Sequence, residues 1–526
     1  MKILFVYPGY IVREVPLNIM YVSSAVKAEG HDTHLFHFSP FKDMSVFKNV
    51  NAQITETFIK TMEEYQPDIV GFTVIKQDYR ITKNLSSIVK DIFKTTVVWG
   101  GIEPILESEM CIKETMVDYI CTGEAELAFP EFLRNLQNGQ EFLHDDRLRL
   151  EIAKESFQPE DSDCETGSKN EKESVVPFPL VKGIWGKDEL NRIIRTGRPR
   201  LVDDINAIPF PDREILDPEY YRAELTGANI LTARGCPFPC TFCQNLELMR
   251  IFKGKGKFVR YRSFDSVFKE MEYLIENFNA PSFYFSDEMF TLSKKRVLEF
   301  CKLYKERGIN KPFMVQTRLD CMDEELAEAL ADAGCSLVNM AIESGNEYLR
   351  NKILKKKFTE KQIIDAYTIC HEKGMMTSSY NMIGIPEETI DNIWETININ
   401  RKLMPDRIMC TIFMPMPGTD LWEQCKSDEL EEYMSDATNY YTQVVYNHPN
   451  LSARTLIGFQ GFFDWYVLLP RWTFPIIHVL RHMYAYSIPP RIPKNPFLKK
   501  IRDIIVEFVY QMKNYLPQKT LQVKAR

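Results

Sequence analysis

The sequence predicts an α/β protein: an N-terminal doubly wound parallel sheet, then a (β/α)6 partial barrel, then a helical C-terminal region. Apolar runs alternate with amphipathic helical patterns over the first 140 residues, and again from residue 229 to about residue 420. That alternation is typical of parallel strands covered by helices. We therefore place the first domain at 1–145, a linker at 146–222, the barrel at 223–420 and the C-terminal region at 421–526.

The first domain contains five candidate strands separated by helical patterns. The strands are expected at 2–8, 33–38, 67–74, 95–101 and 117–124, with helices around 18–31 and 54–65. Ligands of such sheets bind beyond the carboxyl ends of the strands. Thr73, Gly100, Gly101 and Gly123 fall at those ends, where glycine lets a ligand approach the backbone closely. The alternative is that these glycines only make tight turns between strand and helix.

The linker contains a segment of different composition. Residues 154–177 are acidic and Ser-rich with almost no large apolar side chains, so they cannot bury enough surface to offset chain entropy. We expect a mobile insertion there and a free thiol at Cys164. Residues 198–217, punctuated by prolines, are expected to form a connector into the next domain.

The barrel is expected from six further strand–helix units. Strands are predicted at 229–234, 282–287, 313–318, 336–343, 377–384 and 407–415, and helices at 266–278, 294–308, 323–334, 360–374 and 391–404. Barrel sites are built at the carboxyl ends of the strands. Read in order, those ends carry a cysteine loop, Asp287–Glu288, Arg318, Glu343–Ser344, Gly384 and the turn 414–418. Such convergence favours a functional site at one mouth.

The cysteine loop has the spacing C-x3-C-x2-C at Cys236, Cys240 and Cys243. A structural zinc site would take four Cys or His ligands, and no fourth lies nearby in the sequence. Three thiolates suit a [4Fe–4S] cluster whose fourth iron stays open to a ligand. A zinc site and a purely structural trio remain the alternatives, although Pro237 and Pro239 favour an exposed loop over a core strand.

With Phe242 before the third cysteine, "RGCPFPCTFC" resembles the motif of the radical S-adenosylmethionine (SAM) superfamily. The resemblance implies that Cys236, Cys240 and Cys243 ligate the cluster and that SAM chelates its open iron. SAM is then cleaved to a 5′-deoxyadenosyl radical. It also implies SAM contacts for residues at the strand ends: Phe242 and Gly384–Ile385 at the adenine, Asp287 or Glu288 at the ammonium, Arg318 at the carboxylate, and Glu343 and Ser344 at the ribose.

The sequence leaves two of these SAM contacts undecided. "FSDEMFT" stands where the family commonly has Gly-Gly-Glu, so the sequence does not decide between Asp287 and Glu288 as the acceptor. For Arg318 and Glu343, an ordinary ion pair at a strand end is the alternative to a contact with SAM.

The first domain is similar to the cobalamin-binding domain that precedes the barrel in one radical SAM subclass. The resemblance rests on "PLNIMYVSSAVKAEGHD", "PDIVGFTV", "VVWGGIEPI" and "DYICTGEAELAFPEFL". It implies that cobalamin contacts Thr73, Gly100, Gly101, Gly123 and Glu124. The D-x-H-x-x-G motif of many cobalamin proteins is absent, and Glu103 stands where relatives often have His. We expect His31, His34 and His37 to be surface or strand residues. The alternative is a degenerate domain that no longer binds cobalamin.

The subclass predicts an enzyme that transfers a methyl group to an unactivated carbon of a small or lipid-like substrate. Rearrangement or cyclisation without net methyl transfer is one alternative. A non-catalytic iron–sulfur or zinc binding module is another, and it would release no 5′-deoxyadenosine. No residue is assigned to catalysis beyond those that hold the cofactors. A methylthiotransferase is not expected, because Cys111, Cys121 and Cys164 do not form a second clustered loop.

Composition narrows the expected partners and compartment. A net charge of -8 and pI near 5.7 argue against nucleic-acid binding. We see no signal segment or apolar run long enough for a membrane span, and the remaining cysteines are scattered, so a reducing cytoplasm is expected. The family implies an electron donor such as flavodoxin or ferredoxin. The C-terminal region either packs on the barrel and caps its mouth, or forms an apolar channel or peripheral membrane contact.

Overall fold

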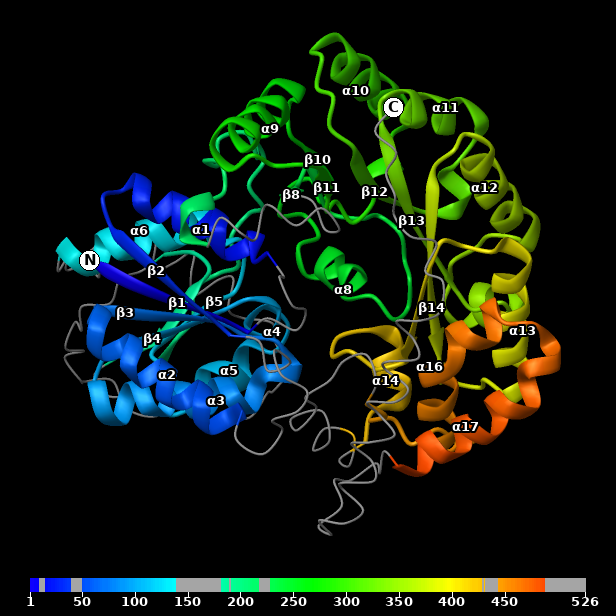
Figure 1. Ribbon diagram of the computed structural model, residues 1–526. Helices are drawn as coiled ribbons and strands as arrows, with labels where there is room; N and C mark the ends of the chain where they lie inside the picture. The colour runs from blue at the N-terminus through cyan, green and yellow to red at the C-terminus, as the bar shows by residue number, and fades with distance from the viewer. Residues whose placement is uncertain are drawn as a thin grey trace. The chain divides into compact units, whose positions relative to one another are not determined.

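The computed structural model describes residues 1–8, 15–38, 50–138, 181–188, 191–216, 228–427, 430 and 443–487. The chain divides into two compact units (Figure 1). The first comprises Met1–Asp217 with Ile251–Phe258, and the second comprises Pro218–Arg250 with Val259–Arg526. The acidic insertion predicted at 154–177, with Cys164, lies outside the described residues. So does the amphipathic pattern predicted near the C-terminus.

The first unit is built on a seven-stranded sheet of order β2-β1-β3-β4-β5-β6-β7. The first five strands are parallel, as predicted: β1 (Lys2–Pro8), β2 (Asp32–Phe38), β3 (Ile69–Thr73), β4 (Thr96–Gly100) and β5 (Tyr119–Cys121). Its helices are α1 (Leu17–Ala28), α2 (Val50–Tyr65), α3 (Tyr79–Ile88), α4 (Ile102–Leu106), α5 (Ser108–Lys113) and α6 (Ala125–Asn138).

Alternate residues of these strands bury against opposite helical layers. Ile3 and Phe5 of β1 join a core with α1 and α6, whereas Leu4 and Val6 join a core with α2 and α3. Both faces of the strand are therefore covered, which explains the continuous apolar run in the sequence. The doubly wound arrangement is confirmed.

Two antiparallel strands extend this sheet within the segment that the sequence assigns to the linker. β6 (Ile184–Lys187) pairs with β5, and β7 (Ile193–Ile194) pairs with β6. The compact unit runs to Asp217, past the predicted boundary at residue 145. Strands of four and two residues carry too little alternation to be recognised from sequence.

The second unit contains the predicted barrel. Six parallel strands follow the order β15-β14-β13-β12-β11-β8, so each barrel strand pairs with the barrel strand that follows it along the chain. They are β8 (Ala228–Ile230), β11 (Phe283–Phe285), β12 (Phe313–Thr317), β13 (Cys335–Glu343), β14 (Met376–Ile383) and β15 (Arg407–Ile412). β8 and β15 do not pair, which leaves an open, partial barrel. All six strands lie where the sequence predicts them.

The helices of this unit begin where polar caps are available. They are α8 (Gln244–Ile251), α9 (Phe264–Phe278), α10 (Lys294–Glu306), α11 (Glu324–Asp332), α12 (Glu360–Glu372) and α13 (Ile390–Leu403). The side chains of Ser263, Ser293, Asp323, Thr359 and Thr389 each accept a backbone N–H in the first turn of α9 to α13. A short antiparallel pair, β9 (Ala233–Arg234) and β10 (Arg260–Tyr261), was not predicted.

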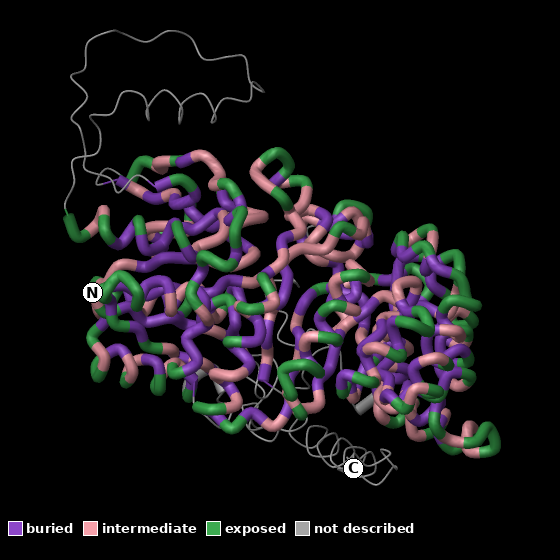
Figure 2. The backbone as a smooth tube through the Cα atoms, turned by 90° about the horizontal axis from the view of Figure 1, so that it is seen from above, coloured by how far each residue is buried: buried purple, intermediate pink, exposed green. Residues whose placement is uncertain are grey.

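Helices of the C-terminal region pack on the open edge of the barrel. They are α14 (Asp420–Cys425), α16 (Ala453–Leu468) and α17 (Phe474–Ser487). α16 shares a core with α13 and β15, and Gln460 donates to the carbonyl of Cys410. Figure 2 shows that buried residues run through the interior of each unit, while exposed residues collect on the outer turns. No described helix is both long enough and apolar enough to cross a membrane.

Candidate functional site

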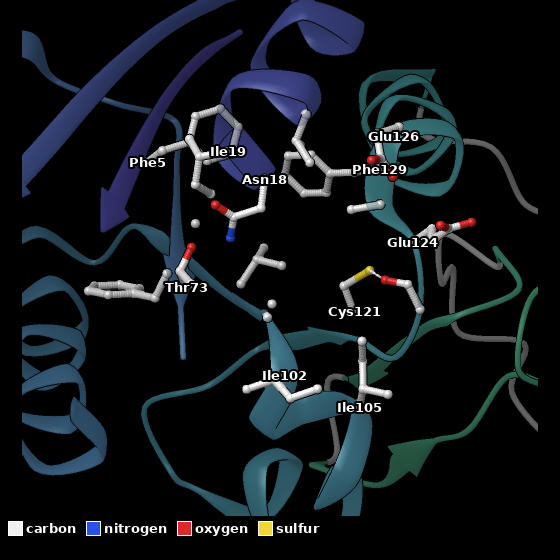
Figure 3. A pocket seen from close by; sticks show the side chains of 18 residues that line it. Phe5, Asn18, Ile19, Thr73, Ile102, Ile105, Cys121, Glu124, Glu126 and Phe129 are labelled. Carbon is white, nitrogen blue, oxygen red and sulfur yellow. Dashed lines mark hydrogen bonds between the residues drawn. The ribbon is translucent and has the colours of Figure 1, made fainter. Parts of the chain in front are cut away.

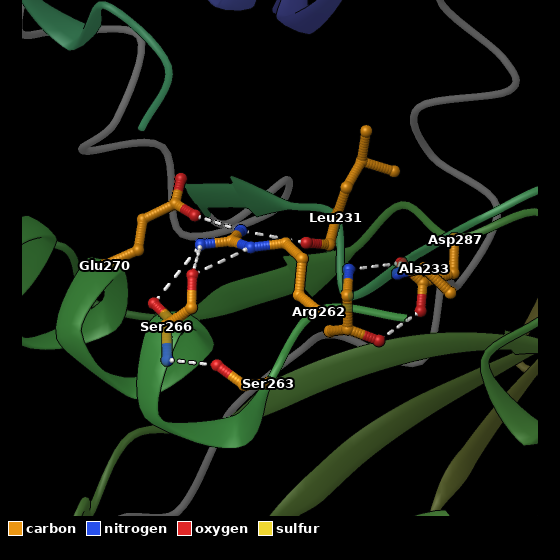
Figure 4. Close-up of polar contacts among 8 residues, drawn as sticks. Leu231, Ala233, Arg262, Ser263, Ser266, Glu270 and Asp287 are labelled. Carbon is orange, nitrogen blue, oxygen red and sulfur yellow. Dashed lines mark hydrogen bonds and ion pairs between the residues drawn. The ribbon is translucent and has the colours of Figure 1, made fainter. Parts of the chain in front are cut away.

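The chain segment that leads into the cysteine loop is held by Asp287, which follows β11 (Figure 4). Its Oδ1 accepts the backbone N–H groups of Thr232 at 2.6 Å and Ala233 at 3.1 Å, and its Oδ2 accepts the Thr232 hydroxyl. The side chain is only 1% exposed, and desolvation raises the pKa of Asp287 to about 6. Both carboxylate oxygens thus accept hydrogen bonds from the segment before the cysteine loop, so Asp287 anchors that segment.

Arg262 fixes the same segment from the other side (Figure 4). Its Nη1 donates to the Leu231 carbonyl at 2.9 Å and forms a buried ion pair with Glu270. Nη2 donates to the Ser266 hydroxyl at 3.0 Å. A buried charge pair of this kind is costly to break on one side, so the path of the chain before the loop is strongly determined.

The three cysteines of the loop are free thiols, with Cys240 buried and Cys236 and Cys243 partly exposed. Burial raises the pKa of Cys236, and that of Cys243 to about 11, and both thiols interact electrostatically with Cys240. Within the described residues, no three Cys, His, Asp or Glu side chains converge closely enough to hold a single metal ion. A [4Fe–4S] cluster requires no such convergence, because each thiolate binds a different iron. The loop therefore fits a cluster.

Glu288, next to Asp287, is in a different environment. It is exposed, and its Oε2 accepts a long hydrogen bond from the Gly235 N–H, at 3.3 Å. Desolvation by the surrounding protein nevertheless raises the pKa of Glu288, opposed by hydrogen bonds from its own backbone and that of Gly235 and by the charges of Arg234 and Arg260. Of the two carboxylates that the sequence left open, Glu288 is thus the exposed one and Asp287 the buried one.

Arg318, after β12, is already paired. Its Nε and Nη2 donate to both oxygens of Asp320 at 3.0 Å, and Nη2 also donates to the Lys356 carbonyl at 2.5 Å. The guanidinium lies 3.9 Å from the ring centre of Phe238 in the cysteine loop. These are the contacts of a strand-end ion pair that also supports the loop, and a SAM carboxylate would have to share the guanidinium with Asp320.

Lys356 also lies at the site, although no sequence pattern pointed to it. It is buried, its Nζ lies 3.0 Å from Glu343 Oε1, and it sits 5.7 Å from the centre of the Phe242 ring. Desolvation lowers the pKa of Lys356, but the charges of Glu343 and Cys240 outweigh it and leave the pKa raised. The site therefore holds a buried cation beside two of the predicted residues.

The segment after β13 places Glu343 and Ser344 differently. Glu343 has φ of 63°, a left-handed conformation uncommon outside glycine and often found at functional sites. Ser344 is fully buried, and its hydroxyl accepts the Asn346 N–H at 3.2 Å. Arg350 donates to the Ser344 carbonyl at 2.9 Å and to that of Gly345 at 3.1 Å. Glu343 lies at the site, whereas the Ser344 side chain is used within its own turn.

Gly384 and Ile385, after β14, are both buried. The Gly384 N–H donates to Glu388, whose pKa burial raises to about 8. His448, from the C-terminal region, donates from Nε2 to the Ile385 carbonyl at 2.8 Å, since its Nδ1 accepts the N–H groups of Asn450 and Leu451. A cofactor at this segment would meet backbone that a buried acid and a buried histidine hold in place. The sequence carried no signal for His448.

In the first unit, one cavity of about 300 Å³ lies at the carboxyl ends of β3, β4 and β5 (Figure 3). The five residues predicted to contact cobalamin all line it: Thr73, Gly100, Gly101, Gly123 and Glu124. Its other lining is mostly apolar and includes Phe5, Ile19, Ile102 and Phe129. Gly101 has φ of 97°, and an added Cβ would lie 3.0 Å from the backbone of Val74, so the wall requires glycine there. A large, flat, mainly apolar group fits this cavity.

Among the residues that the structure describes, none that lines this cavity is a histidine. His31 interacts with the N-terminal amine, at 3.2 Å from Nδ1, and the rings of His34 and His37 contact Tyr65 and Tyr7. Glu103 is fully buried with Lys76 at 3.5 Å and does not line the cavity. Desolvation raises the pKa of Glu103 to about 7.

Two family models match the chain. Residues 230–399 match the radical SAM superfamily and residues 11–133 match the B12 binding domain. The first match contains the cysteine loop and β11 to β14, and the second contains every described residue that lines the cavity of the first unit except Phe5. The motif resemblance and the similarity of the first domain are thus both confirmed.

Full-length similarities extend over both units. The chain is 28% identical over 447 residues to an uncharacterized methyltransferase of Pyrococcus horikoshii, covering 82% of this chain and 84% of that protein. It is 24% identical over 481 residues to the anaerobic magnesium-protoporphyrin IX monomethyl ester cyclase of Rubrivivax gelatinosus, covering 88% and 77%. The fold resembles the radical SAM methyltransferase TsrM from Kitasatospora setae, with a TM-score of 0.62 at 15% identity, covering 98% and 99% of the two chains.

Proposed function

We infer from the two domain matches, which make this chain a radical SAM superfamily protein with a B12 binding domain, that it is a cobalamin-dependent radical SAM methyltransferase. The proposed reaction transfers a methyl group to an unactivated carbon of a small or lipid-like substrate. When bound, the [4Fe–4S] cluster and SAM supply hydrogen abstraction, and cobalamin supplies the methyl group.

One observation carries the proposal. A cavity lined by Thr73, Gly100, Gly101, Gly123 and Glu124 exists in the same chain as a three-cysteine loop at a barrel strand end. The first fits cobalamin and the second fits a cluster with an open iron. A plain hydrogen-abstracting enzyme would have no use for the first, and a structural metal module would account for the second but not for the first.

The barrel residues divide into ligands, contacts and supports. Cys236, Cys240 and Cys243 would hold the cluster, and Glu288 would accept from the SAM ammonium. We assign Glu288 over Asp287 because the oxygens of Asp287 already accept from Thr232 and Ala233. An exposed carboxylate and an ammonium form a charge-assisted hydrogen bond, which is stronger than a neutral one.

The remaining candidates surround the cluster loop. Lys356 would offset the negative charge of the thiolates near Phe242, with Glu343 holding it in place. Arg318 would support the loop through Phe238 and approach a SAM carboxylate from its free side. Gly384 and Ile385 would present backbone toward adenine, as the family resemblance implies.

The test is product analysis after anaerobic reconstitution with iron, sulfide and hydroxocobalamin. SAM with a trideuterated methyl group is supplied with a reductant, and 5′-deoxyadenosine and S-adenosylhomocysteine are measured. A methyltransferase of this type forms both, because one SAM donates its methyl group and another makes the radical. If a preparation with full iron and cobalt content forms neither product, the proposal is overturned. Flavodoxin or ferredoxin is the expected electron donor and can replace the chemical reductant.

The similarity to a cyclase supports a second candidate, cyclisation without net methyl transfer. The same assay separates the two reactions. A cyclase would form 5′-deoxyadenosine without S-adenosylhomocysteine, and no deuterium from the methyl group would enter any product.

A further inference from the structure

The last described helix leaves a row of large apolar side chains exposed. Trp472 is 77% exposed, Ile476 60%, Val479 59% and Met483 50%. The spacing of four, three and four residues puts them on one face of α17 and the turn that precedes it. We call these four residues the apolar stripe. Single exposed apolar residues need no explanation, but a continuous row of them marks a contact surface.

The stripe is a property of the packed helix, because the opposite face of α17 is docked on α16. Ile477 is 1% exposed and joins the core that α16 forms with the barrel. A Cβ at Gly461 of α16 would lie 2.4 Å from Tyr484, so the two helices approach closely through that glycine. The helix therefore has a fixed orientation that directs the stripe away from the barrel.

The helix that carries the stripe is basic in sequence. Residues 471–487 contain Arg471 and Arg481 and no acidic residue. The acidic residue Asp464 of α16 interacts with Tyr484, on the docked side of α17. An exposed apolar helix face in a segment that has arginine and no acidic residue is complementary to a surface that is both apolar and anionic.

We propose that the apolar stripe docks this enzyme on a membrane surface that contains anionic lipid, with α17 lying in the interface. A tryptophan at one end of an apolar face, flanked by arginine, matches the composition of interfacial helices. The helix lies on the membrane and does not span it. This docking does not depend on the reaction proposed above, and it would bring the enzyme to a lipid-like substrate where such a substrate is found.

Flotation with vesicles tests the proposal on the reconstituted full chain. Vesicles of phosphatidylcholine alone are compared with vesicles that also contain phosphatidylglycerol, at about 0.1 M and about 1 M NaCl, where the screening length falls from ~10 Å to ~3 Å. We expect binding to the anionic vesicles that weakens at high salt. The triple variant Trp472→Ser/Ile476→Ser/Val479→Ser should lower the bound-to-free ratio about tenfold or more.

The matched control is Ile92→Ser/Met404→Ser, which removes two apolar side chains that are 60% and 48% exposed elsewhere on the surface. It should bind like the wild type. The proposal is overturned if the wild type does not float with anionic vesicles, or if the stripe and control variants lose vesicle binding equally. Stripe-dependent dimers in size-exclusion chromatography without vesicle binding would instead make the stripe an interface between copies. SAM cleavage without vesicles, measured on the same samples, reports separately on the proposed reaction.

Discussion

The two adjacent carboxylates after β11 provide the sharpest test of the site, because the structure gives them opposite roles. Asp287 accepts three hydrogen bonds from the segment that enters the cysteine loop, at 1% exposure. Removing its carboxylate leaves the backbone N–H groups of Thr232 and Ala233 without a partner, at about 1 to 3 kcal/mol each. The substitution also removes the desolvation cost of the buried carboxyl, which offsets part of this loss of stability. We expect Asp287→Ala to lower the free energy of unfolding by about 2 to 4 kcal/mol.

Glu288 should behave in the opposite way. Glu288 is exposed, and its hydrogen bond from the Gly235 N–H is 3.3 Å long, so Glu288→Gln should change stability by less than about 0.5 kcal/mol. Loss of a charged hydrogen bond to the SAM ammonium, worth about 1.5 to 3 kcal/mol, should weaken SAM binding about 10- to 150-fold. Asp287→Asn is the matched variant, because an amide oxygen can still accept from both N–H groups.

The assay combines thermal unfolding with equilibrium dialysis of SAM, on preparations with equal iron content. Asp287→Ala should lower the unfolding midpoint by roughly 5 to 10 °C, while Asp287→Asn should keep both the midpoint and the affinity for SAM. Glu288→Gln should keep the midpoint and lose the affinity. Equal loss of SAM binding in Asp287→Asn and Glu288→Gln, or loss in Asp287→Asn alone, would refute the assignment.

Three further predictions concern the cluster, the cavity and the buried acid. Cys240→Ala should abolish iron binding while Cys321→Ala retains it; iron lost from both would indicate a four-thiolate site. Gly100→Val, where an added Cβ lies 3.9 Å from its nearest neighbour, should fill the cavity and abolish cobalt retention without changing thermal stability. Burial raises the pKa of Glu388 to about 8 from 4.5 unfolded, so wild-type stability should fall from pH 4.5 to 8 by up to about 1.4 kcal/mol per pH unit. Asp287 and Glu103, whose pKa values are also raised, add slopes of the same sign. Denaturant unfolding across that window should therefore show a shallower slope for Glu388→Gln than for the wild type, and an equal slope would contradict the reasoning.

The strands could be predicted because burial on both faces leaves a continuous apolar run. β3 reads "IVGFT" with all five residues buried. The barrel strands β14 and β15 depart from this rule, because β14 buries polar residues such as Ser378 and Asn381 and β15 is only partly buried. Their alternation with helical patterns locates them instead. β6 and β7 could not be found in this way. They are short, lie at the edge of the sheet and are separated from β5 by residues 139–180, so their pairing depends on the tertiary fold.

Only those parts of the site that local sequence motifs specify could be predicted. The cysteine spacing and the glycines at strand ends are local patterns, whereas the choice between Asp287 and Glu288 depends on which one contacts the chain at Thr232. Lys356 lies within the run Lys355–Lys357, which by charge alone favours a solvated segment. Left-handed backbone at Lys355 and Lys357, with φ of 54° and 59°, accompanies the burial of the central lysine.

The C-terminal region illustrates how an apparently uninformative sequence can complete a site. A six-stranded barrel that does not close leaves β15 as an edge, and edges need a cover. α16 provides it: Gln460 donates to Cys410 of β15, and a Cβ at Gly384 would lie 3.0 Å from Leu456. His448 donates to the Ile385 carbonyl from the chain before α16. The same region thus braces the strand end at Gly384 and Ile385 and packs against α17, so the apolar stripe is connected to the barrel through α16.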